Sequence, residues 1–260
     1  MAGWDVERAV GVLMAAEADR RDLEPITDEW PDLDLATAYA VQDEVLRRKV
    51  AAGERVVGVK LGLTSRAKQQ RMGVDSPLTG WLTDAMVLPT GAPVPQDELI
   101  HPRAEPEIAF VLGRPLAGPG VTAATAMAAV DRVYGGLEII DSRYRDFRFT
   151  LPDVVADNAS SARFVLGAMG LPPDRLDLAL EAVLVEVGGA IVDSATGAAV
   201  QGHPAEALAL AANDLGRRGL RLEAGWLVLT GGMTDAVPVS PGAKVAAHFT
   251  SLGSVTVSGG

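Results

Sequence analysis

Two series of apolar residues at helical spacing open the chain. The series are Val6, Val10, Leu13 and Met14, and then Ala38, Val41, Val45 and Leu46. Asp34 precedes the second series as a candidate N-cap, and Gly53 follows it as a candidate stop. The pattern therefore predicts a helical N-terminal segment over residues 1–54.

The period changes to that of β-strands at residues 56–63, VVGVKLGL, where β-branched residues alternate with other types. Further predicted strands are residues 105–112, 133–141, 163–166, 182–187, 226–230, 244–249 and 254–257. One late helix is predicted over residues 204–218, with Gly219 as its stop. This irregular order predicts an α+β fold with a large mixed sheet, in which residues 55–260 form one catalytic domain.

Composition narrows the class of protein. The 260 residues are 48% hydrophobic and 22% charged, which is enough to bury a core, and the net charge of −11 argues against nucleic acid as a partner. The chain has no cysteine, so disulfides and thiolate metal sites are excluded. Charged residues near the start and the lack of an apolar run of about 18 residues predict a cytoplasmic protein without a membrane segment. No GxGxxG or P-loop motif follows any predicted strand.

Acidic residues on two predicted strands form the first candidate site. Glu105 and Glu107 share one strand face because side chains alternate, and Glu138 lies on a later strand. Glutamates on a strand are usually solvated, but Pro106 cannot donate to a sheet ladder and indicates an irregular or edge strand, where side chains can be aimed at a site. Three converging carboxylates would suit a hard divalent cation, Mg²⁺ or Mn²⁺.

Lys60 is the candidate positive group. It shares a strand face with Gly58 and Gly62, which predicts an open trough where an ammonium contacts a ligand. The alternative interpretation is a lysine that extends along a strand edge into solvent.

Arginines and turn residues supply further candidates. One arginine among Arg143, Arg145 and Arg148 is expected to bind a substrate carboxylate, and Arg143 is the one predicted to be catalytic. The turns at residues 157–161 (DNASS) and 229–232 (LTGG) have the composition of ligand-orienting strand ends or of ordinary turns. The predicted substrate-binding residues are Leu61, Thr64, Asp141, Ser160, Ser161 and Thr230.

The histidines indicate no separate chemistry. His101, His203 and His248 are far apart and show no paired metal-ligand spacing, so structural roles are expected. The absence of a GxSxG motif disfavours a serine hydrolase of the α/β class.

Four segments in order resemble a known family: VVGVKLGLTSRAKQQRMGVDSPLTGWLTD, HPRAEPEIAFV, GLEIIDSRYRDFRFTLPDVVADNASSARFVLG and LTGGMTDAVPVSPG. The chain resembles the hydratase/decarboxylase branch of the fumarylacetoacetate hydrolase superfamily from about residue 6 to residue 257, and KLGLTSRAK with the DSRYRDFRF to DNASS stretch is most similar to its decarboxylases. The resemblance implies a β-roll fold, Glu105, Glu107 and Glu138 as metal ligands, and Lys60 as the lysine of the KxGLT motif. Pro106 departs from the usual alanine between the two glutamates.

The resemblance also implies a reaction and partners. Family members act on small anionic 2-oxo acids with Mg²⁺ or Mn²⁺, and as oligomers. Decarboxylation of 2-oxohex-3-enedioate is expected, with hydration of 2-hydroxypenta-2,4-dienoate as the alternative. Hydrolysis of a C–C bond would need a positioned base that the sequence does not offer, and a non-catalytic partner subunit would not need the four intact site residues. A homo-oligomer and a complex with the hydratase of the same pathway are further expectations.

Overall fold

The computed structural model describes residues 3–65, 69–70 and 77–260. Residues 66–68 and 71–76, which carry part of the family-like motif after Lys60, lie outside the described residues. The described helices are α1 (Val6–Asp19), α2 (Ile26–Glu29), α3 (Leu35–Ala51), α5 (Ala123–Met127), α6 (Leu151–Ala156) and α7 (Pro204–Arg217).

The predicted caps are present in the structure. The Asp34 side chain accepts a hydrogen bond from the Thr37 backbone N–H at 2.7 Å, so it caps α3 as expected. Gly53 has φ +113°, a conformation that glycine adopts without steric cost, directly after the last turn of α3. The short helices α2, α5 and α6 were not predicted because each is too brief to show a helical period.

The described strands form two sheets. The strands are β1 (Val56–Gly62), β2 (Leu78–Thr83), β3 (Arg103–Leu112), β4 (Val130–Ile140), β5 (Ser161–Leu166), β6 (Ala182–Val187), β7 (Ala190–Thr196), β8 (Leu227–Leu229), β9 (Val237–Pro238), β10 (Lys244–Phe249) and β11 (Gly253–Ser258). The larger sheet has the order β2-β1-β8-β3-β4-β5, with β9 also paired to β3, and the smaller has the order β11-β10-β6-β7. Among the pairs of described strands, only β1 and β8 run parallel, so the expected α+β fold with a mixed sheet is confirmed.

Strand β3 lies inside the larger sheet and not at its edge, but the strand is irregular around Pro106, which was the other form of the expectation. Strand β4 pairs along its length, while on the other side β9 pairs with residues 103–104 and β8 with residues 109–111. The Pro106 carbonyl accepts a hydrogen bond from the Met233 N–H in the interval between these two short partners. In a strand, the N–H and the C=O of one residue point to the same neighbouring strand. Pro106 lacks an N–H, but neither β8 nor β9 pairs with it on that side, so the proline breaks no hydrogen bond of the sheet.

The glycines beside Lys60 serve close packing rather than an open trough. A Cβ at Gly58 would lie 1.9 Å from the carbonyl oxygen of Leu227 on β8, and a Cβ at Gly62 would lie 2.9 Å from Leu78 on β2. The glycines therefore allow neighbouring segments to approach β1, and Lys60 is enclosed between them with only 3% of its surface exposed.

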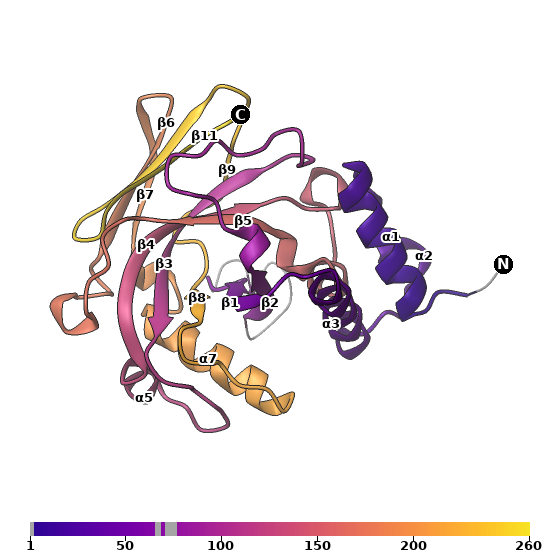
Figure 1. Ribbon diagram of the computed structural model, residues 1–260, viewed down its shortest axis with the longest axis horizontal. Helices are drawn as coiled ribbons and strands as arrows, with labels where there is room; N and C mark the ends of the chain where they lie inside the picture. Colours follow the sequence, from indigo (N-terminus) through magenta and orange to yellow (C-terminus); the bar gives the residue numbers. More distant parts are fainter. Residues whose placement is uncertain (1–2, 66–68, 71–76) are drawn as a thin grey trace.

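Of the three hydrophobic clusters among the described residues, the two larger ones join most of the elements. One lies between the two sheets and α7, and it includes Ile108, Leu137 and Leu208. The other joins α1, α2 and α3 to the region of α6, and Tyr144 is fully buried in it. Figure 1 shows α1, α2 and α3 gathered at one end of the molecule, against the segments that follow β4. Among the residues that the structure describes, no helix has both the length and the apolar character needed to cross a bilayer.

Candidate metal centre and its cavity

Three glutamates meet on one face of the β3–β4 pair. Glu105 lies directly opposite Glu138 in the antiparallel register, and Glu107 is two residues further along β3. Residues two apart on a strand point to the same side, and directly paired residues do so as well. Each glutamate places one carboxylate oxygen within 4.8 Å of the others. The convergence expected from the alternation of β3 is therefore present.

The backbone and a serine hold two of these carboxylates in place. The Gly231 N–H donates to Glu107 Oε2 at 2.7 Å, and the Ser161 hydroxyl donates to Glu138 Oε1 at 2.7 Å. Both glutamates are fully buried. The second oxygen of Glu107, Oε1, is buried and has no hydrogen-bond partner among the described residues. A buried carboxylate oxygen without a donor is costly, which indicates that it serves a ligand.

Burial and mutual repulsion shift the titration of the cluster. Burial raises the pKa of Glu107 well above its ordinary value, and the charges of Glu138 and Glu105 raise it further, whereas Lys60 lowers it. Burial also raises the pKa of Glu138, although the adjacent Lys60 partly opposes this. Ionisation of Glu107 and Glu138 is thus costly, and a cation bound between them would relieve this cost.

Lys60 extends from β1 into the same cluster. Its Nζ lies 3.1 Å from Glu138 Oε2 and donates to the Ala159 carbonyl at 2.9 Å. Burial alone would lower the pKa of Lys60, but the charges of Glu138, Glu105 and Glu107 outweigh burial and raise it. An ammonium has three N–H donors, so these two contacts leave one donor for a ligand.

The donor set fits a hard divalent cation. Among the described groups of the cluster, three carboxylates surround one ammonium. Carboxylate oxygens are the ligands that Mg²⁺ and Mn²⁺ prefer, and the unpartnered Glu107 Oε1 is an oxygen of the required kind. The residues present therefore fit such an ion, with Glu105, Glu107 and Glu138 as its holders.

A cavity of about 160 Å³ opens beside Lys60 and Glu105. Most of its remaining wall is apolar, and it is formed by Leu61, Leu63, Leu78, Ile140, Phe147, Phe149, Val154 and Ala159, with Thr64, Ser160, Gly62 and Gly232 between them. Gly232 has no room for a side chain, because a Cβ there would lie 2.9 Å from the Glu105 carboxyl carbon. A small organic acid could enter this space with its polar end toward Lys60 and Glu105.

Several residues in the cavity wall have unusual backbone conformations. Leu63, Phe147, Ala159 and Ser160 have φ values of 56°, 57°, 54° and 58°. Such left-handed conformations are unfavourable for residues with side chains and concentrate at functional sites. In the turn at residues 157–161, this conformation accompanies the Ala159 carbonyl that accepts the Lys60 hydrogen bond.

The predicted substrate-binding residues divide into two groups. Leu61, Thr64 and Ser160 contribute to the cavity wall. The others are buried beside it: Ser161 binds Glu138, the Thr230 hydroxyl donates to the Ile108 carbonyl at 2.8 Å, and Asp141 accepts the N–H groups of Ile100 and His101. Their observed contacts hold the backbone and a glutamate around the site.

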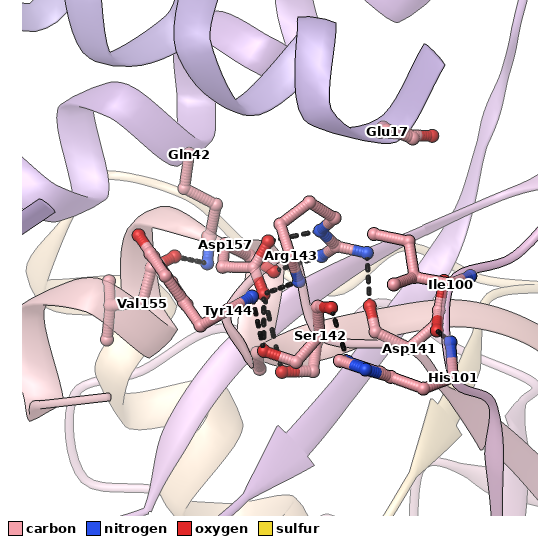
Figure 2. A network of polar contacts seen from close by, with 12 residues as sticks. Glu17, Gln42, Ile100, His101, Asp141, Ser142, Arg143, Tyr144, Val155 and Asp157 are labelled. Atoms are coloured by element: carbon pink, nitrogen blue, oxygen red, sulfur yellow. Dashed lines mark hydrogen bonds and ion pairs between the residues drawn. The ribbon is translucent and has the colours of Figure 1, made fainter. Parts of the chain in front are cut away.

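Arg143 is not among the described residues in the wall of the cavity, and Figure 2 shows it in a network of polar contacts with Asp157 and Asp141. Its guanidinium forms a buried ion pair with the Asp157 carboxylate and donates to the backbone carbonyls of Asp141 and Asp157, each at 2.6 Å. The Leu23 N–H donates to the Arg143 carbonyl at 2.8 Å, which draws this segment toward the N-terminal helices. The geometry thus does not place Arg143 at the substrate, and its contacts are those of a residue that positions the turn at residues 157–161.

Arg145 and Arg148 are also directed elsewhere. Both form ion pairs with Glu24, and their side chains are more than half exposed. Among the described residues that line the cavity, none of the three predicted arginines appears. The expectation that one of them lies at the substrate is not met by this geometry.

The three histidines have structural contacts, as expected. The His101 ring nitrogen Nε2 lies 2.8 Å from the Ser142 carbonyl, and His203 caps α7 by accepting from the Ala205 N–H. His248 contacts Ser254 and Glu186 on the smaller sheet. None of them is among the described residues in the cavity wall, so a histidine base for C–C hydrolysis is not found there.

Sequence reasoning did not identify Phe147 and Phe149 as cavity residues. Both follow the left-handed bend at Asp146 and face the cavity, although they alternate with arginines and appear from sequence to be part of a polar loop. The Gly231 N–H was also missed as the donor to Glu107. Its only sequence signal was the glycine pair in LTGG.

Comparison with known proteins agrees with this geometry. The family model for the fumarylacetoacetate (FAA) hydrolase C-terminal region matches residues 55–258. The chain therefore belongs to the fumarylacetoacetate hydrolase family, and its mixed sheet with N-terminal helices is the fold of that family.

Individual relatives are similar over nearly the whole chain. It is 46% identical over 241 residues to a 4-oxalocrotonate decarboxylase of Pseudomonas sp. (strain CF600), covering 93% of this chain and 91% of the relative. It is 41% identical over 247 residues to a 2-hydroxyhexa-2,4-dienoate hydratase of Comamonas testosteroni, covering 94% of each. A solved structure of 4-oxalocrotonate decarboxylase from Pseudomonas putida G7, complexed with magnesium and adipate, superposes with a TM-score of 0.95 at 41% identity and covers 99% of each chain. The relatives are thus enzymes that include both decarboxylases and hydratases.

Proposed function

We propose that this protein is a divalent-metal-dependent lyase that converts 2-oxohex-3-enedioate (4-oxalocrotonate) to 2-hydroxypenta-2,4-dienoate and CO₂. The observation that carries the proposal is the buried cluster of Glu105, Glu107 and Glu138 beside Lys60, at the base of a cavity for a small acid. The 46% identity to a 4-oxalocrotonate decarboxylase supports the choice of reaction.

The three glutamates would hold Mg²⁺ or Mn²⁺, and the magnesium in the related solved structure supports this assignment. When bound, such an ion supplies a Lewis acid for the 2-oxo acid end of the substrate. The bond between C5 and C6 breaks, and C6 leaves as CO₂. The electron pair of the broken bond forms the C4–C5 double bond. The former C3–C4 pair becomes the C2–C3 double bond, and negative charge accumulates on the C2 oxygen.

Lys60 is suited to act on that oxygen. Its ammonium is already oriented by the Ala159 carbonyl and Glu138, and one N–H remains to stabilise the developing negative charge or to transfer a proton that completes the 2-hydroxy group. The apolar wall around Phe147, Phe149 and Leu78 limits water beside the dienol product, which favours release of the product over its hydration.

Hydration of 2-hydroxypenta-2,4-dienoate is the second candidate function. The 41% identity to a hydratase over 94% of this chain favours it, and the same cluster could bind the 2-oxo acid form of that substrate. A homo-oligomer and an assembly with the hydratase of the same pathway stay predictions.

Product identification distinguishes the two reactions. Purified protein is incubated with 4-oxalocrotonate and, separately, with 2-hydroxypenta-2,4-dienoate, each with Mg²⁺, with Mn²⁺ and after chelation. The proposal expects CO₂ and the dienoate from the first substrate, only with metal, and slower turnover of the second. Turnover of the second substrate alone would replace the proposal by a hydratase, and turnover that is independent of metal would contradict both.

A further inference from the structure

Arg103 is a cation on the same strand face as the candidate metal ligands. It is the first residue of β3 and lies two residues before Glu105, so its side chain leaves the sheet on the side of Glu105 and Glu107. Its direct partner on β4 is Ile140, just as the partner of Glu105 is Glu138. Ile140 contributes to the cavity wall, and paired residues project to the same side, which places Arg103 beside the cavity.

The guanidinium of Arg103 lies over a ring that forms part of the cavity wall. Its Cζ is 4.1 Å from the centroid of the Phe147 ring. The His101 ring also contacts Phe147, with 4.9 Å between the ring centroids, so the phenyl group is held by two neighbours in its left-handed backbone conformation. Arg103 is not itself among the described residues of the cavity wall, but its strand partner Ile140 and the ring of Phe147 beneath its guanidinium both are, so the guanidinium lies next to the wall.

Arg103 also differs from the three arginines predicted to bind the substrate in how its charge is used. Arg143, Arg145 and Arg148 are paired with carboxylates. No ion pair or side-chain hydrogen bond of Arg103 is found within the described part of the chain. A guanidinium whose face rests on an aromatic ring keeps its N–H edge available for a carboxylate.

The spacing along β3 matches a six-carbon diacid. Two strand residues span about 7 Å, so the backbone separation of Arg103 and Glu105 is comparable to the length of an extended chain between the two ends of such an acid. We propose that Arg103 binds the distal carboxylate of the substrate and sets the preference for dioic over monoic 2-oxo acids. The inference rests on the proposed function, because it assigns the 2-oxo end of the same substrate to the glutamate cluster.

Two ligands that differ only in the distal group test this assignment. 2-Oxoadipate and 2-oxohexanoate share the 2-oxo acid end and the chain length, and neither carries the double bond through which electrons leave in the proposed reaction. Their dissociation constants are measured by calorimetry with Mg²⁺ for the wild type, Arg103→Met and Arg103→Lys. Arg148→Met is the matched control, because Arg148 is exposed and paired with Glu24.

We expect the wild type to bind 2-oxoadipate more tightly than 2-oxohexanoate by about 10- to 100-fold, the value of a charge-assisted hydrogen bond. Arg103→Met should lose this preference by weakening only the diacid, and Arg103→Lys should retain part of it. With 4-oxalocrotonate, KM should rise much more than kcat falls, while Arg148→Met should resemble the wild type.

Each outcome bears on one of the two proposals. A preserved diacid preference in Arg103→Met, or equal weakening of both ligands in a variant whose melting temperature is unchanged, would overturn the role of Arg103. If Arg103→Met unfolds, the Arg103→Lys variant decides: a diacid preference equal to that of the wild type counts against the bidentate contact. A wild type that prefers the diacid through Arg103 but does not decarboxylate 4-oxalocrotonate would overturn the proposed function and leave the diacid contact supported.

Discussion

The protein buries two groups of charged side chains, and the two groups differ in how fully their charges are satisfied. In the first, three glutamates surround one ammonium, and Glu107 Oε1 has no hydrogen-bond partner among the described residues. In the second, the guanidinium of Arg143 meets one carboxylate, Asp157, and its nitrogens also donate to two backbone carbonyls (Figure 2). Among the described residues, the first group contains more carboxylates than cations, whereas the ion pair of the second group joins one cation to one carboxylate.

The difference separates a binding site from the structure that supports it. A buried charge without a partner reduces stability, so it persists in a fold where a ligand supplies the missing charge. A buried pair in which each guanidinium nitrogen donates a hydrogen bond fixes the local backbone, and removal of one partner destabilises the fold. The two groups meet at the turn at residues 157–161, because Asp157 holds one end of that turn and the Ala159 carbonyl holds Lys60.

The largest effect is expected at Glu107. Glu107→Gln should abolish detectable decarboxylation and weaken Mg²⁺ or Mn²⁺ binding at least about tenfold, because a neutral amide replaces a charged ligand. The metal-free variant should melt at a higher temperature than the metal-free wild type, since one of the repelling buried charges is gone. Metal titration and thermal unfolding check both statements.

The exposed pair of Glu29 with Arg8 supplies the control for Glu107. Glu29→Gln should leave metal binding and activity unchanged, because its side chain is 70% exposed. Unaltered metal affinity in Glu107→Gln would remove this residue from the set of ligands.

Lys60→Ala comes next in expected effect. It should lower kcat by about 10²- to 10⁴-fold, the range for a positioned acid or base, and leave metal affinity nearly intact because the ammonium is not an ion ligand. Single-turnover rates at saturating metal, with the melting temperature measured in parallel, test this separation. Lys49→Ala is the control, since Lys49 is a partly exposed lysine paired with Glu17. A folded Lys60→Ala variant with full activity would contradict the catalytic assignment.

Removing Arg143 should affect stability more than chemistry. Arg143→Met leaves the Asp157 carboxylate buried without its partner, so the free energy of unfolding should fall by about 3–5 kcal/mol in denaturant titrations. The double variant Arg143→Met with Asp157→Leu should recover part of that loss, because no uncompensated charge remains. If Arg143→Met keeps its stability but its KM for the substrate rises, Arg143 would belong to the binding site.

The smallest expected effect is a pH dependence of stability at Asp157. Burial raises the pKa of Asp157 from 3.8 to about 6, although Arg143 opposes the shift. Between about pH 4 and pH 6 the folded state therefore keeps the proton of Asp157, whereas the unfolded state releases it. The contribution of Asp157 to the free energy of unfolding thus falls as the pH rises through this interval, by up to about 3 kcal/mol. Asp157→Asn should lack this slope. An unfolding free energy of the wild type that rises relative to Asp157→Asn across the same interval would show that the pair is ionised throughout.

Alternation along β3 was enough to predict that Glu105 and Glu107 share a face, but not the pairing of β3 with β4 that brings Glu138 beside them. Glu105 and Glu107 share a face in any strand, and Glu138 completed the set. The same rule placed Lys60 on β1, but its burial follows from the approach of β8 at Gly58, a contact between segments about 170 residues apart that no local pattern contains. Arg103 was missed, even though it obeys the same alternation as Glu105.

Long-range contacts place the three predicted arginines outside the described wall of the cavity. The direction of Arg143 is set by the bond between its carbonyl and the Leu23 N–H, and by Asp157 beyond a bend. Strands β2 and β7 were not predicted either: β2 is a six-residue segment with a central glycine, and β7 is largely exposed, so neither shows a clear buried face. Local periodicity thus predicts which residues share a face, and tertiary contacts decide where long side chains reach.

The paired register of β3 and β4 makes the ligand set a property of strand alignment. Glu105 stands opposite Glu138, and a slip of β3 by one residue would turn Glu105 and Glu107 toward the hydrophobic core and bring Pro106 to the site. A misaligned chain would therefore have no competent set of oxygens, and a cation would stabilise only molecules with the correct alignment. Metal in the refolding medium would then increase the fraction of molecules with the native strand pairing, even before any substrate is present.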